Sequence, residues 1–228
     1  MTEQELALRY APIVHFDQNE TIPLQAVGYS IAKETTRSQS FPKREIVVPQ
    51  DAAFVIEYAY YWDYDIQHMY DLEHIWVTVS GDGQVMDAEG SFHGKYLKLL
   101  LPELPGALLP TQGHVHAFCQ PGKHAFMPNG QLFRLLPDWY AACTTACGGP
   151  VLIGGCFNGV YQPTAQEDAC SIRYLRENLS FKPTLHFTKT AEDFGVSPRY
   201  MPWTELYAEI PQRIRRECDR LLKLYQTT

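Results

Sequence analysis

The segment from Asp63 to Val79 constrains the fold of this chain more than any other part of the sequence. Its first twelve residues carry six carboxylate or imidazole side chains, and its last five, Ile75–Val79, are apolar or β-branched. A short run of that kind predicts a β-strand with at least one face buried in a core. We therefore expect a sheet in which a dense group of acidic and imidazole side chains comes directly before a buried strand.

Asp71 and Glu73 are separated by a single residue just before this run. Residues two apart on a strand share a face, so the two carboxylates are predicted to point the same way and His74 to the opposite side. His68 would reach them from the preceding loop, and no Lys or Arg occurs between positions 45 and 94. Close carboxylates repel each other unless a positive charge lies beside them, and a divalent metal ion is the simplest candidate.

The identity of this ion depends on which other side chains join the site. Carboxylates with water favour Mg²⁺ or Ca²⁺, whereas several imidazoles favour Zn²⁺, Mn²⁺ or Fe²⁺. His124 follows a Pro-Gly turn, and His93 lies in a glycine-flanked loop, so either could be aimed at the same edge. His114 and His116 share one face of a predicted strand and could chelate a metal, although such pairs are more often satisfied by hydrogen bonds.

Further strands follow from alternating apolar patterns. Phe54–Tyr61 and Gly113–Cys119 alternate with a period of two, and Ser80–Gly83 is a strong hairpin signal after Ile75–Val79. The first of these strands would deliver Asp63 and Asp65 to its far end. Short strands spaced by turns, with few helices, predict a mainly β fold, an antiparallel β-sandwich of the jelly-roll type.

Helices are expected only at the two termini. Thr2 and Glu5 form a capping-box pattern for a first helix. A second helix is predicted at about residues 210–226, with Pro211 at its first position and an apolar stripe along one side. Residues 33–45 and 143–160 are expected to be loops. With no linker or repeat in the sequence, residues 1–228 are predicted to form a single domain.

Composition narrows the range of partners. The formal net charge of −7 argues against nucleic-acid binding, which needs clustered Lys and Arg. The start of the chain lacks the apolar segment of a signal peptide, and no apolar run reaches the roughly 20 residues that span a bilayer. These features predict a cytoplasmic protein with no transmembrane segment. In that compartment the six cysteines are expected to be free thiols.

Several motifs together resemble a known family. His68–Ile75 is similar to the His-x-x-Asp-Trp-Glu-His motif in the family of vacuolar protein sorting-associated protein 62, and more distantly to the Gly-His-Arg-His-Asp-Trp-Glu heptad of the necrosis- and ethylene-inducing toxin-like proteins. Tyr10–Phe16, Ser91–Gly94 and Gly122–Ala125 also resemble segments of the first family. The resemblance covers residues 7–128, a little over half of the chain.

The resemblance implies a β-sandwich with a divalent ion at one edge. It implies that Asp71 and Glu73 are direct ligands and that His68 lies close, either directly or through water. The toxin family also uses an acid from the preceding strand, for which Asp63 or Asp65 is the nearest counterpart. This chain departs from the motifs at two positions, with Leu72 in place of the Trp and Tyr70 in place of the second His of the toxins.

Two functions are compatible with such a site. One is a metal-dependent hydrolase, in which the ion activates a bound water and His124 or His93 acts as general base or acid. The alternative is a non-catalytic, metal-assisted binding module for a small molecule such as a sugar or lipid headgroup. A thiol role for Cys143 and Cys147 is a third, weaker possibility.

Overall fold

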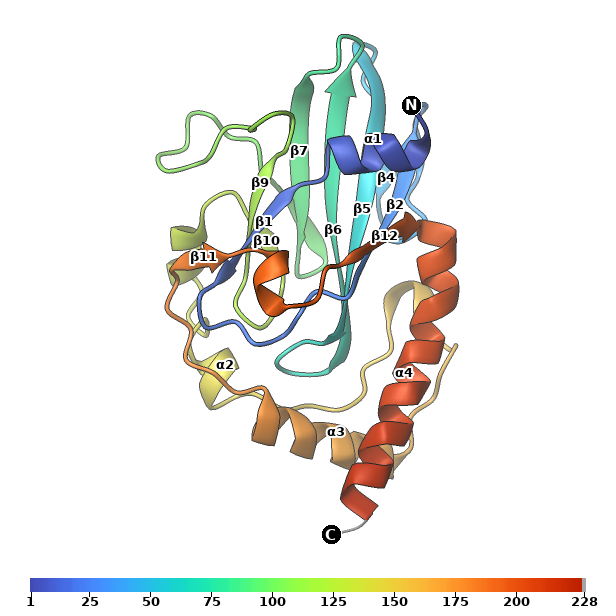
Figure 1. The fold of residues 1–228 in the computed structure, drawn as a ribbon, viewed down its shortest axis with the longest axis vertical. Helices are drawn as coiled ribbons and strands as arrows, with labels where there is room; N and C mark the ends of the chain where they lie inside the picture. Colours follow the sequence, from blue (N-terminus) through green and yellow to red (C-terminus); the bar gives the residue numbers. More distant parts are fainter. Residues whose placement is uncertain (227–228) are drawn as a thin grey trace.

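The larger sheet of the protein has six strands in the order β12-β2-β5-β6-β7-β8. The computed structural model describes residues 1–226 (Figure 1). The strands of this sheet are β2 (Ala26–Ala32), β5 (Ala52–Tyr64), β6 (Met69–Ser80), β7 (Val85–Phe92), β8 (Lys95–Lys98) and β12 (Arg199–Pro202). The predicted strands over 54–61 and 75–79 are thus confirmed as parts of β5 and β6. Both are longer than predicted, so Asp63 belongs to β5, and Asp71, Glu73 and His74 belong to β6 itself.

The pairing of β5 with β6 fixes which side chains share a face. Trp62 lies opposite Asp71 and Tyr60 lies opposite Glu73, whereas His74 lies opposite Ala59. Opposed residues in an antiparallel pair project to the same side of the sheet. The prediction that Asp71 and Glu73 share a face, with His74 on the other, is therefore confirmed.

A second sheet has four strands in the order β10-β9-β1-β11. Its strands are β1 (Ile13–Asp17), β9 (His116–Cys119), β10 (Phe126–Met127) and β11 (Phe187–Lys189). β1 pairs in parallel with β9, and β2 pairs in parallel with β12. Both sheets are therefore mixed, which corrects the expectation of an antiparallel jelly-roll. The parallel pairs join distant parts of the chain, and no local turn in the sequence sets their direction. A separate small pair joins β3 (Thr36–Arg37) and β4 (Glu45–Ile46).

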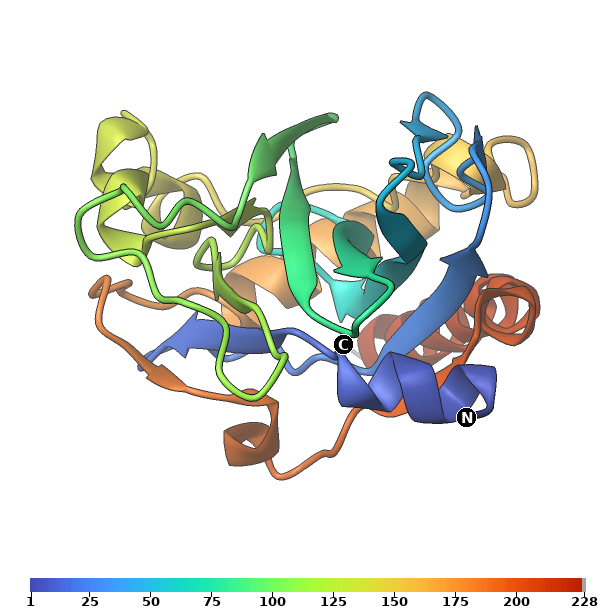
Figure 2. The same ribbon diagram turned by 90° about the horizontal axis from the view of Figure 1, so that it is seen from above.

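The two sheets meet through the face that carries Asp71 and Glu73. Tyr60 and Trp62 are almost fully buried on this face, and the ring of Phe126 in β10 lies 5.2 Å from the ring of Tyr60. The sheets approach closely at Gly90, where a Cβ atom would lie 2.7 Å from the Cβ of Phe126. Figure 2 shows the sheets as two layers seen from above. We call this face of the larger sheet the inner face.

Helices make up more of the structure than the sequence patterns predicted, with 31% strand and 27% helix. The fold is mixed α/β rather than mainly β. The helices are α1 (Glu3–Arg9), α2 (Ala141–Thr144), α3 (Ala165–Asn178) and α4 (Trp203–Gln226), with short 3-10 turns at Gly130–Leu135, Gly155–Phe157 and Ala191–Phe194. The capping box of Thr2 and Glu5 is confirmed at α1. Within residues 1–226, none of the helices is long and apolar enough to cross a bilayer.

The C-terminal helix α4 begins earlier than predicted. Pro211 lies inside it rather than at its first position, because Trp203 and Leu206 extend the buried stripe by two turns toward the N-terminus. α4 packs along the outer face of the larger sheet, next to β2 (Figure 1). At Gly28 of β2 a Cβ atom would lie 3.0 Å from side-chain atoms of both Leu206 and Trp203. The glycine therefore sets how closely the helix can approach the sheet.

Candidate functional site

Asp71 and Glu73 are held inside the protein by neighbouring strands and by one turn. Asp71 accepts a hydrogen bond from Nδ1 of His124 at 3.0 Å. Glu73 accepts one from the hydroxyl of Ser91 in β7, and Ser91 Oγ in turn accepts from the backbone N–H of His74 at 2.6 Å. Glu73 is buried, and the Asp71 side chain is only 13% exposed. The two carboxylates are therefore shielded from bulk water while each keeps a protein partner.

His124 is fully buried and stacks on Trp62, with ring centroids 4.2 Å apart and planes inclined by 4°. Burial lowers the pKa of His124 to about 4, against the opposing influence of Glu20 and Asp65. At neutral pH the ring is uncharged and donates from Nδ1 to Asp71. Within residues 1–226, His124 Nε2 and Trp62 Nε1 are buried without a hydrogen-bond partner.

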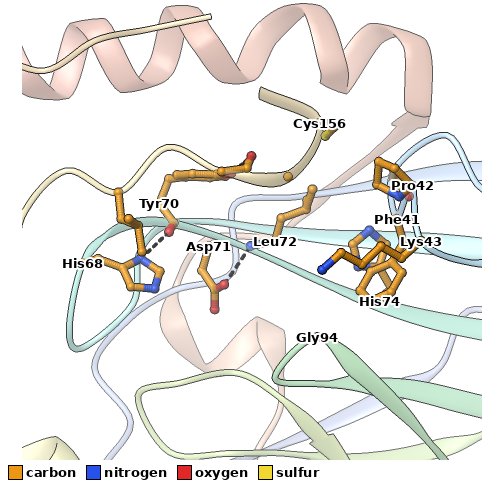
Figure 3. A pocket seen from close by; sticks show the side chains of 14 residues that line it. Phe41, Pro42, Lys43, His68, Tyr70, Asp71, Leu72, His74, Gly94 and Cys156 are labelled. Atoms are coloured by element: carbon orange, nitrogen blue, oxygen red, sulfur yellow. Dashed lines mark hydrogen bonds between the residues drawn. The ribbon is translucent and has the colours of Figure 1, made fainter. Parts of the chain in front are cut away.

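Asp65 and His68 form the turn that leads into β6. Asp65 is buried and accepts hydrogen bonds from the backbone N–H groups of Gln67 and His68, the latter at 2.7 Å. His68 Nδ1 donates to the carbonyl of Tyr70 at 2.8 Å, and its Nε2 lies 3.3 Å from Asp65 Oδ2 (Figure 3). The turn therefore orients His68 as the sequence analysis expected, from the loop that approaches the strand.

The surroundings of Asp71 and Glu73 disfavour ionised carboxylates. Burial raises the pKa of Asp71, and the nearby charge of Asp65 raises it further. Burial and then the charge of Asp71 hold the pKa of Glu73 well above its ordinary value. The nearby cation Lys123 is shared with Asp138, whose carboxylate lies 3.6 Å from Nζ. At neutral pH the pair therefore retains a proton unless a cation replaces it.

Two of the predicted site residues lie elsewhere. Asp63 forms a two-pronged ion pair with Arg213 of α4, at 2.6 and 2.9 Å, and accepts from the hydroxyl of Tyr61. His93 is hydrogen-bonded through Nε2 to Oε1 of Gln120 at 2.7 Å. The structure thus brings together Asp65, His68, Asp71, Glu73 and His124, but not Asp63 or His93.

The remaining histidine and cysteine candidates are engaged within the fold. His114 Nδ1 donates to the carbonyl of Ala11 at 2.7 Å, and His116 Nδ1 lies 2.8 Å from Nε2 of His15. Cys143 and Cys147 are buried and unpaired, and burial raises the pKa of both thiols. Among residues 1–226, no group of three or more His, Cys, Asp or Glu side chains is arranged to hold a metal ion.

A pocket of about 420 Å³ opens beside Asp71 and His68. Figure 3 shows these two residues near one end and Phe41, Lys43 and His74 at the other. The remaining lining is largely apolar and consists of Ser40, Pro42, Tyr70, Leu72, Gly94, Leu152, Gly154, Gly155 and Cys156. The sequence of residues 33–45 and 143–160 predicts only loops, because no local pattern indicates that two separate loops will fold over the same strand.

Glu20 is a further residue that sequence reasoning missed. It is 1% exposed and accepts hydrogen bonds from the backbone N–H groups of Ile22 at 3.0 Å and Gly122 at 2.6 Å. Burial raises the pKa of Glu20, while the nearby His124 and these N–H groups lower it. Since Gly122 lies in the turn that carries His124, Glu20 anchors the residue that binds Asp71. Its sequence context, an exposed-looking Asn-Glu-Thr, gave no sign of this role.

Comparisons with known proteins give a distant structural similarity. No family model and no curated protein matches the chain. The solved structure of NLPPya in complex with glucosamine shares 16% identity at a TM-score of 0.37, covering 55% of this chain and 65% of that chain. The complex of NLPPya with mannosamine shares 17% identity at a TM-score of 0.36, with the same coverage.

NLPPya is a necrosis- and ethylene-inducing peptide 1-like protein, so this distant similarity concerns the more remote of the two families that the sequence resembles. This chain spans about two thirds, 65%, of the length of those NLPPya structures. The similarity is one of backbone arrangement over 55% of the chain. The resemblance to the vacuolar sorting family stays a prediction.

Proposed function

We propose that this protein is a non-catalytic binding module that takes a small hydroxylated ligand, such as a sugar or a lipid headgroup, into the pocket beside Asp71, with the help of a divalent cation. The observation that carries this proposal is a shielded carboxylate, Asp71, among the residues that line a largely apolar pocket of about 420 Å³. Ligand sites commonly combine mainly apolar walls with a few fixed polar groups. Phe41, Tyr70 and Leu72 would cover the apolar face of a sugar ring, and Asp71, whose carboxylate points to the opposite face of β6 from Leu72, would act on the ligand through the cation.

The positions of the two candidate general bases support binding over hydrolysis. Neither His124 nor His93 lines the pocket, and His124 is fully buried. A general base must come within hydrogen-bond reach of the proton that it removes. His124 instead donates to Asp71, which would hold that carboxylate in a fixed direction toward a ligand.

The cation is supported by the chemistry of the available donors. Asp65, Asp71 and Glu73 offer carboxylate oxygens, the ligands that Ca²⁺ and Mg²⁺ prefer, and His68 adds an imidazole. Raised carboxyl pKa values mark a place where positive charge is favourable. These donors are of the kind that a hard divalent ion prefers, but among residues 1–226 they are not already arranged to hold one, so the ion would have to draw them together as it coordinates ligand hydroxyl groups.

Isothermal titration with glucosamine and mannosamine tests the proposal. Their ammonium group complements a carboxylate, and both are bound in the solved NLPPya structures. Each probe should be titrated with Ca²⁺, Mg²⁺ or Zn²⁺ present and again with chelator. We expect wild-type protein to bind at least one probe, more tightly with an ion, and Asp71→Asn to bind it at least tenfold more weakly, the loss of about 1.4 kcal/mol.

Asp82→Asn is the matched control, because Asp82 lies exposed in the β6–β7 turn and undergoes the same chemical change. It should bind as the wild type does. Equal binding by Asp71→Asn and wild type would contradict the proposed site. Release of nitrophenol from p-nitrophenyl phosphate, at a rate lost in Asp71→Asn, would contradict the non-catalytic assignment.

A further inference from the structure

A second cavity of about 420 Å³ lies apart from the pocket beside Asp71 and shares none of its lining residues. It is bounded by the start of β1, by Tyr60 of β5 and by the segment between β11 and β12. Its apolar walls include Ile13, Leu24 and Tyr200. Cavities of this size are large enough for a small organic molecule.

The hydroxyl of Tyr60 is the unusual feature of this cavity. Tyr60 is 1% exposed and is among the residues that line the cavity; its hydroxyl oxygen is buried with no hydrogen-bond partner in the described part of the chain, so a ligand oxygen reaches it only when the cavity wall shifts. The neighbouring tyrosines are satisfied, since Tyr58 donates to the carbonyl of Ala7 at 2.8 Å and Tyr61 to Asp63 at 2.9 Å. Buried hydroxyls without a partner are rare, and each calls for a water or ligand that completes it.

The cavity favours an uncharged ligand. No Lys or Arg is among the residues that line it, and its one acidic residue, Glu192, is exposed at the rim. Burial raises the pKa of the Tyr60 phenol well above its ordinary value, with nearby Tyr200 adding to the effect, so the hydroxyl stays protonated and able to donate. His114 donates from Nδ1 to the carbonyl of Ala11.

We propose that this cavity is a second binding site, for a small neutral molecule with an apolar body and one hydroxyl group, whose oxygen accepts a hydrogen bond from Tyr60. The apolar body would lie against Ile13, Leu24 and Tyr200, where its transfer from water is favourable. A charged ligand would lose its hydration here without gaining a partner of opposite sign. A cluster of waters around the hydroxyl is the competing occupant, and the test below separates the two.

The test is a titration with benzyl alcohol and with toluene, which has the same ring without the hydroxyl. Binding is followed by NMR through the methyl groups of Ile13, Val14 and Leu24, with exposed Val47 as the reference methyl. In the wild type we expect benzyl alcohol to shift the three cavity methyls and to leave Val47 unchanged. Tyr60→Phe should weaken benzyl alcohol binding roughly five- to tenfold, the effect of one buried hydrogen bond, and leave toluene binding unchanged.

Ala191→Trp gives a second readout, because Ala191 lines the cavity and a large side chain there would fill it. This variant should bind neither probe while keeping a native methyl spectrum away from the cavity. The proposal is overturned if benzyl alcohol shifts no cavity methyl, which would leave only water in the cavity. It is also overturned if Tyr60→Phe binds benzyl alcohol as tightly as wild type does.

Discussion

Single residues decide how the Asp71 site responds to charge. Asp71 and Glu73 face the sheet interior, and Asp65 lies close enough to raise the pKa of both. The neutral ring of His124 gives Asp71 a hydrogen bond but no charge. A proton and a divalent ion would each relieve the same repulsion, so these two species should compete for the site.

Glu20 is expected to stabilise the turn that carries His124 without contacting Asp71 itself. Glu20→Gln would place an amide N–H₂ where a carboxylate oxygen now accepts from Ile22 or Gly122. Leaving a buried backbone donor unpaired costs about 1–3 kcal/mol. We expect urea denaturation to show a loss of that size, and Glu103→Gln at an exposed position to change stability little. A loss equal to that of Glu103→Gln would contradict the anchoring role.

Elements far apart in the sequence form the Asp71 site and the helix layer that packs on the same sheet. β6 supplies Asp71, the turn after β9 supplies His124, and α4 packs on the outer face of the same sheet at β2, β5 and β12. The helix can lie close to β2 because Gly28 has no side chain. The geometry of the outer layer therefore depends on a single position in the sheet.

Gly28→Val tests this dependence. A Cβ atom there would lie 3.0 Å from Leu206 and Trp203, so α4 must shift, at a cost of about 1–3 kcal/mol. Gly81→Ala is the control, because a Cβ atom at Gly81 meets no atom within 4 Å. Thermal unfolding should show a clear loss of stability for Gly28→Val only. Similar melting temperatures for both variants would contradict the close packing of α4.

Some elements could be predicted from local sequence, and others depended on distant contacts. The faces of Asp71, Glu73 and His74 follow from a period of two, which needs no tertiary information. The helix α3 was missed although Thr164 and Glu167 form the same capping box that indicated α1. The parallel pairing of β12 with β2 had no local signal, because it depends on where the chain returns.

Site residues also differ in whether local sequence or distant contacts determine their positions. His124 was a candidate because its Pro-Gly turn suggested an exposed edge, yet the structure buries it against Trp62. Glu20 could not be predicted, since its partner Gly122 is 102 residues away. Asp63 was expected beside Asp71, but successive strand residues point to opposite faces, and its charge is taken by Arg213.

At the scale of the whole molecule, the titrating groups give a definite pH dependence. His15, His74 and His124 have lowered pKa values of about 4, 3 and 4, so the stability they contribute is complete above pH 6.5 and is lost as the pH falls. Asp71 and Glu73 have raised pKa values, so the folded state keeps protons that the unfolded chain releases above about pH 4. Their contribution therefore falls as pH rises. Above pH 6.5 these histidines no longer change the free energy of unfolding with pH. The pH dependence that remains there comes from Asp71 and Glu73.

The free energy of unfolding between pH 6.5 and 8, measured with chelator and again with excess Ca²⁺ or Mg²⁺, tests the central claim most directly. With chelator we expect stability to fall by up to about 1.4 kcal/mol per pH unit for each proton that the folded Asp71–Glu73 pair keeps. Bound ion replaces that proton, so the slope should flatten and stability should rise. Asp71→Asn should flatten the slope in chelator and gain nothing from the ion. Identical slopes with and without ion, unchanged in Asp71→Asn, would contradict a cation-binding site at Asp71.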